Sequence, residues 1–262
     1  MIRYLTLYKY FLRFSFSKAM EFRIDFFFRF LMDIIYYVVN ILFFQVIYLH
    51  TPILAGWTQD QMILFIAGYL LCDGLNMTIF SNNIWWFPQL INRGDLDYYL
   101  IRPVSPLFFL SLREFAANSL MNLLVAMGFF VYALFQYQSS FTMLDLLFYL
   151  FLLICGVLLQ YCIQMLFVLP SFWIQNKRGL IDFFYAIALA GERPDRIYKG
   201  FVRILFTYII PLSLVASYPA RFFIEPFNPW LLVHFFGICA FFWLLMLTVW
   251  KKGVSSYSSA SS

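Results

Sequence analysis

Long apolar stretches dominate this sequence, and each of them is long enough to cross a lipid bilayer as a helix. A spanning helix needs about 20 apolar residues, because the hydrocarbon core of a bilayer is about 30 Å thick. The 262 residues are 63% hydrophobic and only 12% charged, whereas soluble domains are roughly 25% charged. We therefore expect an all-α, polytopic membrane protein with six transmembrane helices. They fall at residues 26–49, 61–87, 106–135, 142–173, 201–218 and 229–250.

The basic residues predict which side of the membrane each loop faces, since Lys and Arg concentrate in cytoplasmic loops. With six spans and both termini cytoplasmic, 17 of the 18 Lys and Arg residues fall on the cytoplasmic side. Only Arg221 falls on the other side. The predicted topology is therefore six spans with both termini cytoplasmic, in an integral, multi-pass protein.

Residues 1–25 form a separate element, because the first 22 of them predict an amphipathic helix. Successive residues of an α-helix are rotated by about 100° about its axis, which assigns the polar and apolar residues to opposite faces. The polar face carries Thr6, Lys9, Arg13 and Ser17, and the opposite face carries Leu5, Tyr8, Leu12, Phe16 and Ala19. Such a helix lies in the membrane interface. Two interpretations remain open: a membrane anchor, or a lever that contacts a cytosolic partner.

Residues 88–105 form a predicted cytoplasmic loop, in which a dense polar segment interrupts the apolar sequence. Gly94 and Asp95 suit a tight turn, and Asp95 or Asp97 can cap a short helix after it. The pair Ser105 and Pro106 then begins the next helix, as its N-cap and first residue. We expect a short, rigid helix–turn unit. The alternative is an ordinary solvated loop whose Arg residues only follow the charge rule.

The last third of the chain is predicted to be irregular. Residues 180–190 are too short to span and lie between basic clusters, so we expect an interfacial or docked helix with both ends cytoplasmic. Pro211 removes a backbone hydrogen bond from the fifth span and should kink or break it. Irregular backbone at membrane depth must be covered by protein or water. Residues 211–229, which are rich in proline, therefore predict short, partly re-entrant helices on the extracytoplasmic side.

Motifs for catalysis are absent from the sequence. It contains no GxxxxGK[ST] phosphate loop and no HExxH, GxSxG or GxGxxG pattern, so we expect no enzyme activity and no cofactor in this chain. The four cysteines lie in apolar runs without a CxxC spacing, and the two histidines have no neighbouring ligand residues. Structural cysteines and no metal site are the prediction.

Several polar residues fall within the predicted spans. Asp73 and Asn76 lie about one turn apart in the second span, and Gln160 and Gln164 share one face of the fourth. A charged Asp at the bilayer centre costs roughly 2.5–3.5 kcal/mol, so Asp73 should face protein or water. Buried amides join helices at about 0.6 kcal/mol each. Both roles, joining helices and lining a pathway, stay open for these side chains.

Four segments, taken together with the predicted topology, resemble the type-2 ABC permeases, which are the membrane subunits of ATP-binding-cassette exporters. The segments are RYLTLYKYFLRFSF followed by EFR, GDLDYYLIRPVSPLF, SFWIQNKRGL and IIPLSLVASYPARFF. The resemblance covers nearly the whole chain, in order. One departure is GERPDRIYKG, because the family pattern before the Tyr consists of smaller and less charged residues.

The resemblance implies partners and a site. Such permeases work in pairs on two separate ATPase subunits, which bind ATP and Mg, and the second permease is identical or related. The lipid bilayer is the other partner, and no nucleic acid is expected. The bacterial plasma (inner) membrane is the implied location. The implied ATPase-coupling residues are Gly94, Asp95, Leu96, Asp97, Arg102, Pro103 and Pro106. The amphipathic N-terminus, with Lys9 and Arg13, would be the connecting helix beside them.

The resemblance also implies a pathway lined by spans two and five. Its implied lining residues are Asp73, Asn76, Phe80, Thr207 and Tyr208. The implied outer gate contains Pro211, Pro219 and Pro226. The leading hypothesis is export of a lipidic, peptide or drug-like substrate, driven by a separate ATPase. The alternatives are a self-contained channel or secondary carrier without an ATPase, and an intramembrane enzyme.

Overall fold

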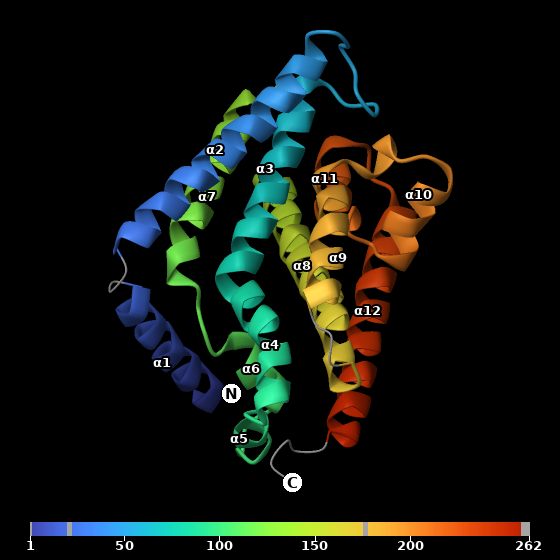
Figure 1. Cartoon of the computed structure of the whole chain (residues 1–262). Helices are drawn as coiled ribbons and strands as arrows, with labels where there is room; N and C mark the ends of the chain where they lie inside the picture. Colours follow the sequence, from blue (N-terminus) through green and yellow to red (C-terminus); the bar gives the residue numbers. More distant parts are fainter. Residues whose placement is uncertain (1, 20–22, 175–177, 258–262) are drawn as a thin grey trace.

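The computed structural model describes residues 2–19, 23–174 and 178–257, and within this part of the chain every regular element is a helix. Figure 1 shows an elongated bundle whose rods run between two ends. One end, called the 49–58 end, carries the loop between α2 and α3, and the opposite end, called the α5 end, carries α1, α5 and the last turn of α12. The main helices are α1 (Ile2–Ala19), α2 (Arg23–Tyr48), α3 (Gln59–Asn76), α4 (Asn82–Arg93), α5 (Asp97–Leu100), α6 (Pro106–Leu112), α7 (Leu120–Gln136), α8 (Met143–Val168) and α12 (Pro229–Ser256).

The all-α prediction is confirmed, and several helices have the length and apolar composition of membrane spans. Four of the described helices can cross a membrane on these grounds: Leu31–Tyr48, Gln59–Arg93, Met143–Phe172 and Pro229–Ser256. A bent pair of helices would be a fifth candidate, and α7 is apolar but shorter. These bounds agree with the predicted first, second, fourth and sixth spans.

The second predicted span is longer than expected. One continuous rod runs from α3 through the π-helical turn η1 (Met77–Ser81) into α4, so residues 88–93 of the predicted loop are helical. The rod ends where Gly94 adopts a left-handed conformation, with φ of 75°, which glycine tolerates without a Cβ clash. The hydroxyl of Ser81 donates to Oδ1 of Asn76 at 2.6 Å across the π-helical turn.

The third predicted span is interrupted between α6 and α7. Asn83 explains the interruption, because its amide accepts the Glu114 N–H at 3.0 Å and donates to the Glu114 carbonyl at 2.7 Å. The next two N–H groups of the unwound segment are also bound, one to the hydroxyl of Ser15 and one to the carbonyl of Thr78. Neighbouring helices therefore replace the hydrogen bonds that a continuous helix would make, as buried backbone requires.

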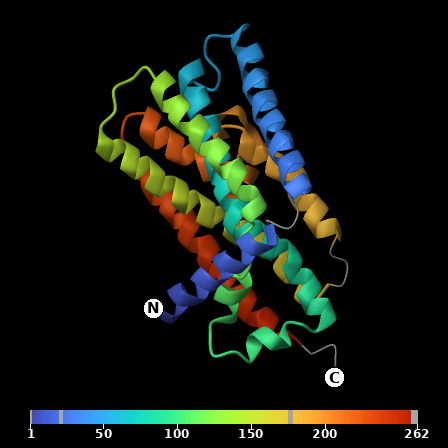
Figure 2. The ribbon, with the colours of Figure 1, turned by 90° about the vertical axis from the view of Figure 1, so that its left-hand side faces the viewer.

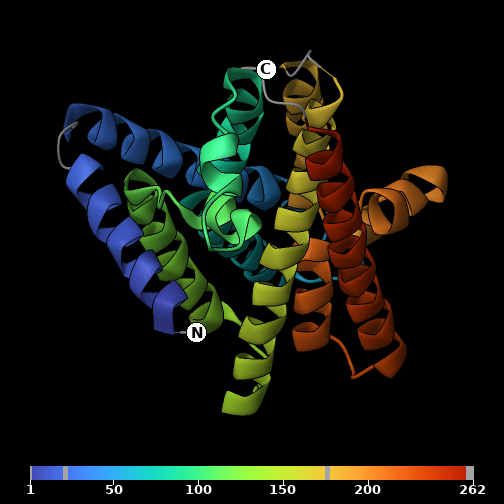
Figure 3. The ribbon, with the colours of Figure 1, turned by 90° about the horizontal axis from the view of Figure 1, so that it is seen from below.

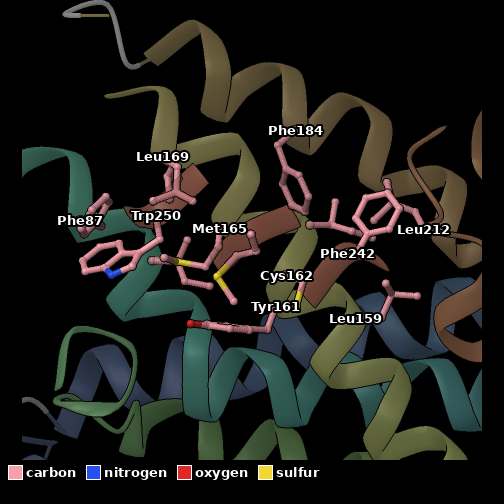
Figure 4. Packing of buried hydrophobic residues seen from close by; sticks show 14 of the residues in the cluster. Phe87, Leu159, Tyr161, Cys162, Met165, Leu169, Phe184, Leu212, Phe242 and Trp250 are labelled. Carbon is pink, nitrogen blue, oxygen red and sulfur yellow. The ribbon is translucent and has the colours of Figure 1, made fainter. Parts of the chain in front are cut away.

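α8 is the central rod, and it packs against α3, α11 and α12. Its start is fixed by a capping box between Thr142 and Asp145. Figure 4 shows the apolar packing along its second half, where Tyr161 and Met165 lie among side chains of α4, α9 and α12. At Gly156 the backbone of α11 lies so close that a Cβ would clash with the Val215 carbonyl. A glycine at this position allows the two helices to pack at short range.

α9 (Arg178–Ala188) and the turn η4 (Leu189–Glu192) correct the expected path of the chain. α9 is the predicted docked helix, with Phe184 packed against Trp85 and Phe167. The segment does not return to the α5 end, however. The guanidinium of Arg193 lies 4.2 Å from the Phe43 ring, in the last turns of α2, which places it toward the 49–58 end.

Two predictions are therefore wrong. The two ends of the 180–190 helix do not lie on the same side of the bundle, and the basic residues that follow it do not share the side of the other Lys and Arg residues. Arg196 instead pairs with Glu225, which accepts a hydrogen bond from Trp57 in the 49–58 loop. The physical reason is that acidic side chains of the fold neutralise these basic residues, as Glu225 does for Arg196. The prediction counted only Lys and Arg and so ignored these partners.

The fifth predicted span, 201–218, is broken. α10 (Gly200–Ile204) and the π-helical turn η6 (Leu205–Ile209) are bent by 97° relative to α11 (Leu214–Ile224). The break surrounds Pro211, as predicted. Figure 1 shows α10 projecting from the side of the bundle and α11 running back to the 49–58 end, where α12 begins.

Candidate functional site

The first candidate site is the α5 turn, defined as residues 94–106 at the α5 end of the bundle. Gly94 closes α4, and its carbonyl accepts the N–H of Asp97 at 3.4 Å. α5 starts at Asp97 and its N-cap residue is Leu96, so neither Asp95 nor Asp97 holds the capping position. Ser105 caps α6 by accepting the N–H of Phe108, and Pro106 is its first residue, as predicted.

The α5 turn is anchored on one side and exposed on the other. Leu96 is 0% exposed and lies in the apolar core with residues of α4 and α6, whereas Ile101 is 80% exposed. Arg102 donates to the Tyr98 carbonyl at 3.1 Å, and its guanidinium lies 5.2 Å from the Phe109 ring. Pro103 is exposed beside it. The result is a stiff knob with an exposed apolar tip at the end of the bundle.

α1 packs against the α5 turn and α6. The hydroxyl of Tyr4 accepts a hydrogen bond from the Ser105 N–H at 3.3 Å. The Tyr4 ring also meets the Phe108 ring edge to face, with centres 4.8 Å apart. Phe11 makes a similar contact with Phe109 at 5.0 Å. Figures 2 and 3 show α1 lying across the side of the bundle at a steep angle to α2.

The face of α1 that contacts the bundle differs in part from the predicted apolar face. Tyr4, Phe11 and Ser15 make the contacts, whereas Leu5 is exposed. Lys9 and Arg13 are exposed, as expected of the polar face. Residues 20–22 and the side chains of Phe16 and Ala19 lie outside the described residues. The predicted connecting helix is thus placed beside the predicted coupling residues.

The second candidate site is a cavity of about 290 Å³ in the middle of the bundle. It lies between α2, the α3–α4 rod, α8 and α9, where Asp73 from the rod meets Glu192 from η4. The hydroxyl of Tyr36 donates to Oε1 of Glu192 at 2.5 Å, and that of Tyr37 donates to Oδ1 of Asn122. The amide of Gln160 hydrogen-bonds the carboxylate of Asp73.

The structure brings together only part of the predicted pathway lining. Asp73 lines the cavity, and Asn76 is fully buried one turn away, bound to the cavity residue Ser81. Phe80 instead packs against Tyr161, with ring centres 4.7 Å apart. The other two lie on η6. Thr207 is buried, whereas the Tyr208 ring lies tilted against that of His234, with centres 4.8 Å apart, and lines a separate apolar hollow.

Sequence reasoning missed the two cavity residues Tyr36 and Glu192. Tyr36 lies in an apolar run, where no local signal distinguishes it from a lipid-facing residue. Glu192 belongs to the GERPDRIYKG departure, so the unusual charge of that segment was the available signal.

The predicted gate prolines do not lie together: Pro219 and Pro226 lie toward the 49–58 end, whereas Ile210, the neighbour of Pro211, lines a hollow beside the second half of α8. Pro211 lies in the break, Pro219 within α11, and Pro226 in the link to α12. Asp195, in the turn η5 (Asp195–Ile197), is 1% exposed and pairs with Arg221 at 3.1 Å and Arg203 at 3.8 Å. Burial raises the pKa of Asp195, and Arg221, Arg203 and Arg196 oppose this effect.

The described residues offer no obvious place for a metal ion, because no three His, Cys, Asp or Glu side chains gather among them. The four cysteines are free thiols, two of them fully buried. The histidine His234 hydrogen-bonds the Tyr218 hydroxyl at 2.9 Å through Nδ1. The two candidate sites are therefore an exposed knob and a polar cavity.

Comparison with known proteins gives one match. A family model described as "ABC-2 family transporter protein" matches residues 34–261, which is most of the chain. No curated protein and no solved structure matches significantly.

Proposed function

Because the chain belongs to the ABC-2 family of transporter proteins, it is a membrane-spanning permease subunit, and we propose that it exports its substrate with energy supplied by separate ATPase subunits. The family describes an integral, multi-pass component of transport that is not itself catalytic. The proposal adds a pair of permeases, identical or related, on two ATPase subunits that hold ATP and Mg, in the bacterial plasma (inner) membrane. The observation that carries it is the α5 turn.

The α5 turn fits the role of a coupling element. Its exposed apolar tip at Ile101 can enter a groove on a partner, while the buried Leu96 keeps the turn from bending away. A force on Arg102 or Pro103 would therefore pass into α4 and α6, which are rods that end at the turn. The exposed Lys9 and Arg13 of the docked α1 lie on a helix held against the same turn.

The proposed topology has six crossings and cytoplasmic termini. The crossings are α2, the α3–α4 rod, α7, α8, the α9–η4 segment and α12. The bent pair of α10 and α11 is then a re-entrant element on the extracytoplasmic side, and Pro211, Pro219 and Pro226 belong to an outer gate. The proposed pathway follows the face of α2, α3 and α9, where the polar cavity lies.

One pair of single-residue changes tests the coupling. The Ile101→Glu variant should lose ATPase co-purification from native membranes, because a carboxylate replaces the apolar tip. Ile53→Glu is the matched control, since Ile53 is also an exposed apolar residue but lies at the 49–58 end. Retention of the ATPase by Ile101→Glu, or its equal loss from Ile53→Glu, would contradict the coupling assignment.

Cysteine labelling tests the orientation. In a variant whose four cysteines are replaced by serine, a cysteine at position 53 should react in intact cells with a membrane-impermeant maleimide. A cysteine at position 101 should react only after the cells are opened. The reverse pattern would place the α5 turn outside the cell and reject the proposed mechanism.

A further inference from the structure

We propose that the central cavity binds an amphipathic organic ammonium ion, so that the exported substrate class is an amine with an apolar or aromatic body. This inference rests on the proposed function, because it names the substrate of the same pathway. It starts from the charge of the lining. Three carboxylates, Asp33, Asp73 and Glu192, line the cavity, and among its described lining residues none is Lys, Arg or His.

Two buried amides supply a second and independent observation. Gln160 is 8% exposed and Gln164 is 4% exposed, and both line the cavity. Their Oε1 atoms accept no hydrogen bond from any described residue. A buried acceptor without a partner is destabilising, so these oxygens favour a ligand that brings N–H donors. An ammonium group brings three donors and a positive charge.

The walls of the cavity select the rest of the ligand. Rings of Tyr36, Tyr69, Trp85 and Tyr185 line it, together with Phe184. Aromatic faces attract cations and also pack against apolar bodies. A metal ion fits less well, since the acidic side chains described here do not gather as a metal-binding group. The volume of about 290 Å³ suits a small organic molecule.

An adjoining hollow of about 490 Å³ provides a route to the cavity. The two adjoin beside the π-helical turn, because they share Met77, Ser81 and Trp85 of the rod and also Asp33, Asn122 and Tyr185. The hollow extends to Phe28 and Met32, exposed residues in the first turns of α2. An amphipathic amine could therefore enter from the bilayer near the proposed cytoplasmic side, with its charged group reaching Asp73 last.

The binding test uses the full chain in lipid nanodiscs and the fluorescent primary amine dansylcadaverine. Its N-acetyl derivative is the matched ligand control, because it keeps the dansyl ring and the chain but loses the charge. Empty nanodiscs correct for partition into lipid. We expect the amine to bind at least about tenfold more tightly than the acetylated form, which corresponds to about 1.4 kcal/mol. Equal binding of the two ligands would overturn the proposal, whatever the variants do.

Variants then locate the site. Asp73→Asn and Glu192→Gln should each weaken dansylcadaverine binding about tenfold, since each removes one negative charge from the cavity. Asp182→Asn is the matched control, because Asp182 is exposed on α9 and does not line the cavity. Unchanged binding in both cavity variants would overturn the assignment. The assay needs no ATPase, so its failure is distinct from a failure of the co-purification test.

Discussion

The backbone N–H of Ser105 donates a hydrogen bond to the hydroxyl of Tyr4, with N and O 3.3 Å apart. The bond joins the first helix of the chain to the N-cap of α6, about a hundred residues later. Ser105 belongs to the α5 turn, so a movement of the turn reaches α1 directly. The N-terminal helix is thus held against the proposed coupling unit.

Tyr4→Ala should loosen α1. The substitution removes this hydrogen bond and the edge-to-face contact with Phe108, which together stabilise the docked helix by about 1–2 kcal/mol. Amide hydrogen exchange in α1 should then become about tenfold faster. Tyr10→Ala is the control, because Tyr10 is an exposed tyrosine on the same helix. Equal exchange in the two variants would show that Tyr4 does not hold α1.

The sequence predicted the long rods well, because a run of about 20 apolar residues has few other structures available in a bilayer. The start of α6 at Ser105 and Pro106, and the break at Pro211, were also predictable, since both depend on local backbone chemistry. The gap after α6 was not, because it depends on Asn83, which reaches the backbone of Glu114 from another helix.

The path of α9 was mispredicted for an electrostatic reason. The positive-inside rule counts Lys and Arg, but Arg196 is paired with Glu225, and Arg193 lies over the Phe43 ring. Such pairing reduces the cost of placing these arginines at the 49–58 end. The polar cavity was predictable only in part. Asp73 was identifiable because it is a charged residue within a predicted span, whereas its position in the same cavity as Glu192 depends on the tertiary structure.

Gly156→Ala should destabilise the contact between α8 and α11. The added Cβ would clash with the carbonyl oxygen of Val215, which belongs to backbone and moves only with the helix. Overpacking of this kind costs about 1–3 kcal/mol. For a chain of this size, each kcal/mol lowers the midpoint of thermal unfolding by about 2–4 °C. Thermal unfolding in detergent measures the effect.

The matched control for this change is Gly237→Ala. Gly237 lies in α12 with no atom within 4 Å of the added Cβ, so alanine there should be neutral or stabilising through its better helix propensity. A lower midpoint for Gly237→Ala than for Gly156→Ala would show that helix spacing at Val215 is not limiting.

Arg221→Met should destabilise the 49–58 end more than Asp195→Asn. Without Arg221, the buried Asp195 loses its 3.1 Å partner, and removing one member of a buried pair costs about 3–5 kcal/mol. Asp195→Asn leaves Arg221 paired with Glu225 at 3.4 Å.

Burial raises the pKa of Asp195, so the folded state binds its proton more tightly than the unfolded state does. The wild-type chain should therefore gain stability relative to Asp195→Asn as the pH falls from about 7 to about 4.5. Unfolding midpoints at both pH values measure this difference.

Arg203→Met is the control for Arg221→Met, because Arg203 is largely exposed and its contact with Asp195 is longer, 3.8 Å. A loss of stability as large as that of Arg221→Met would mean that the cluster depends on total charge rather than on the buried pair.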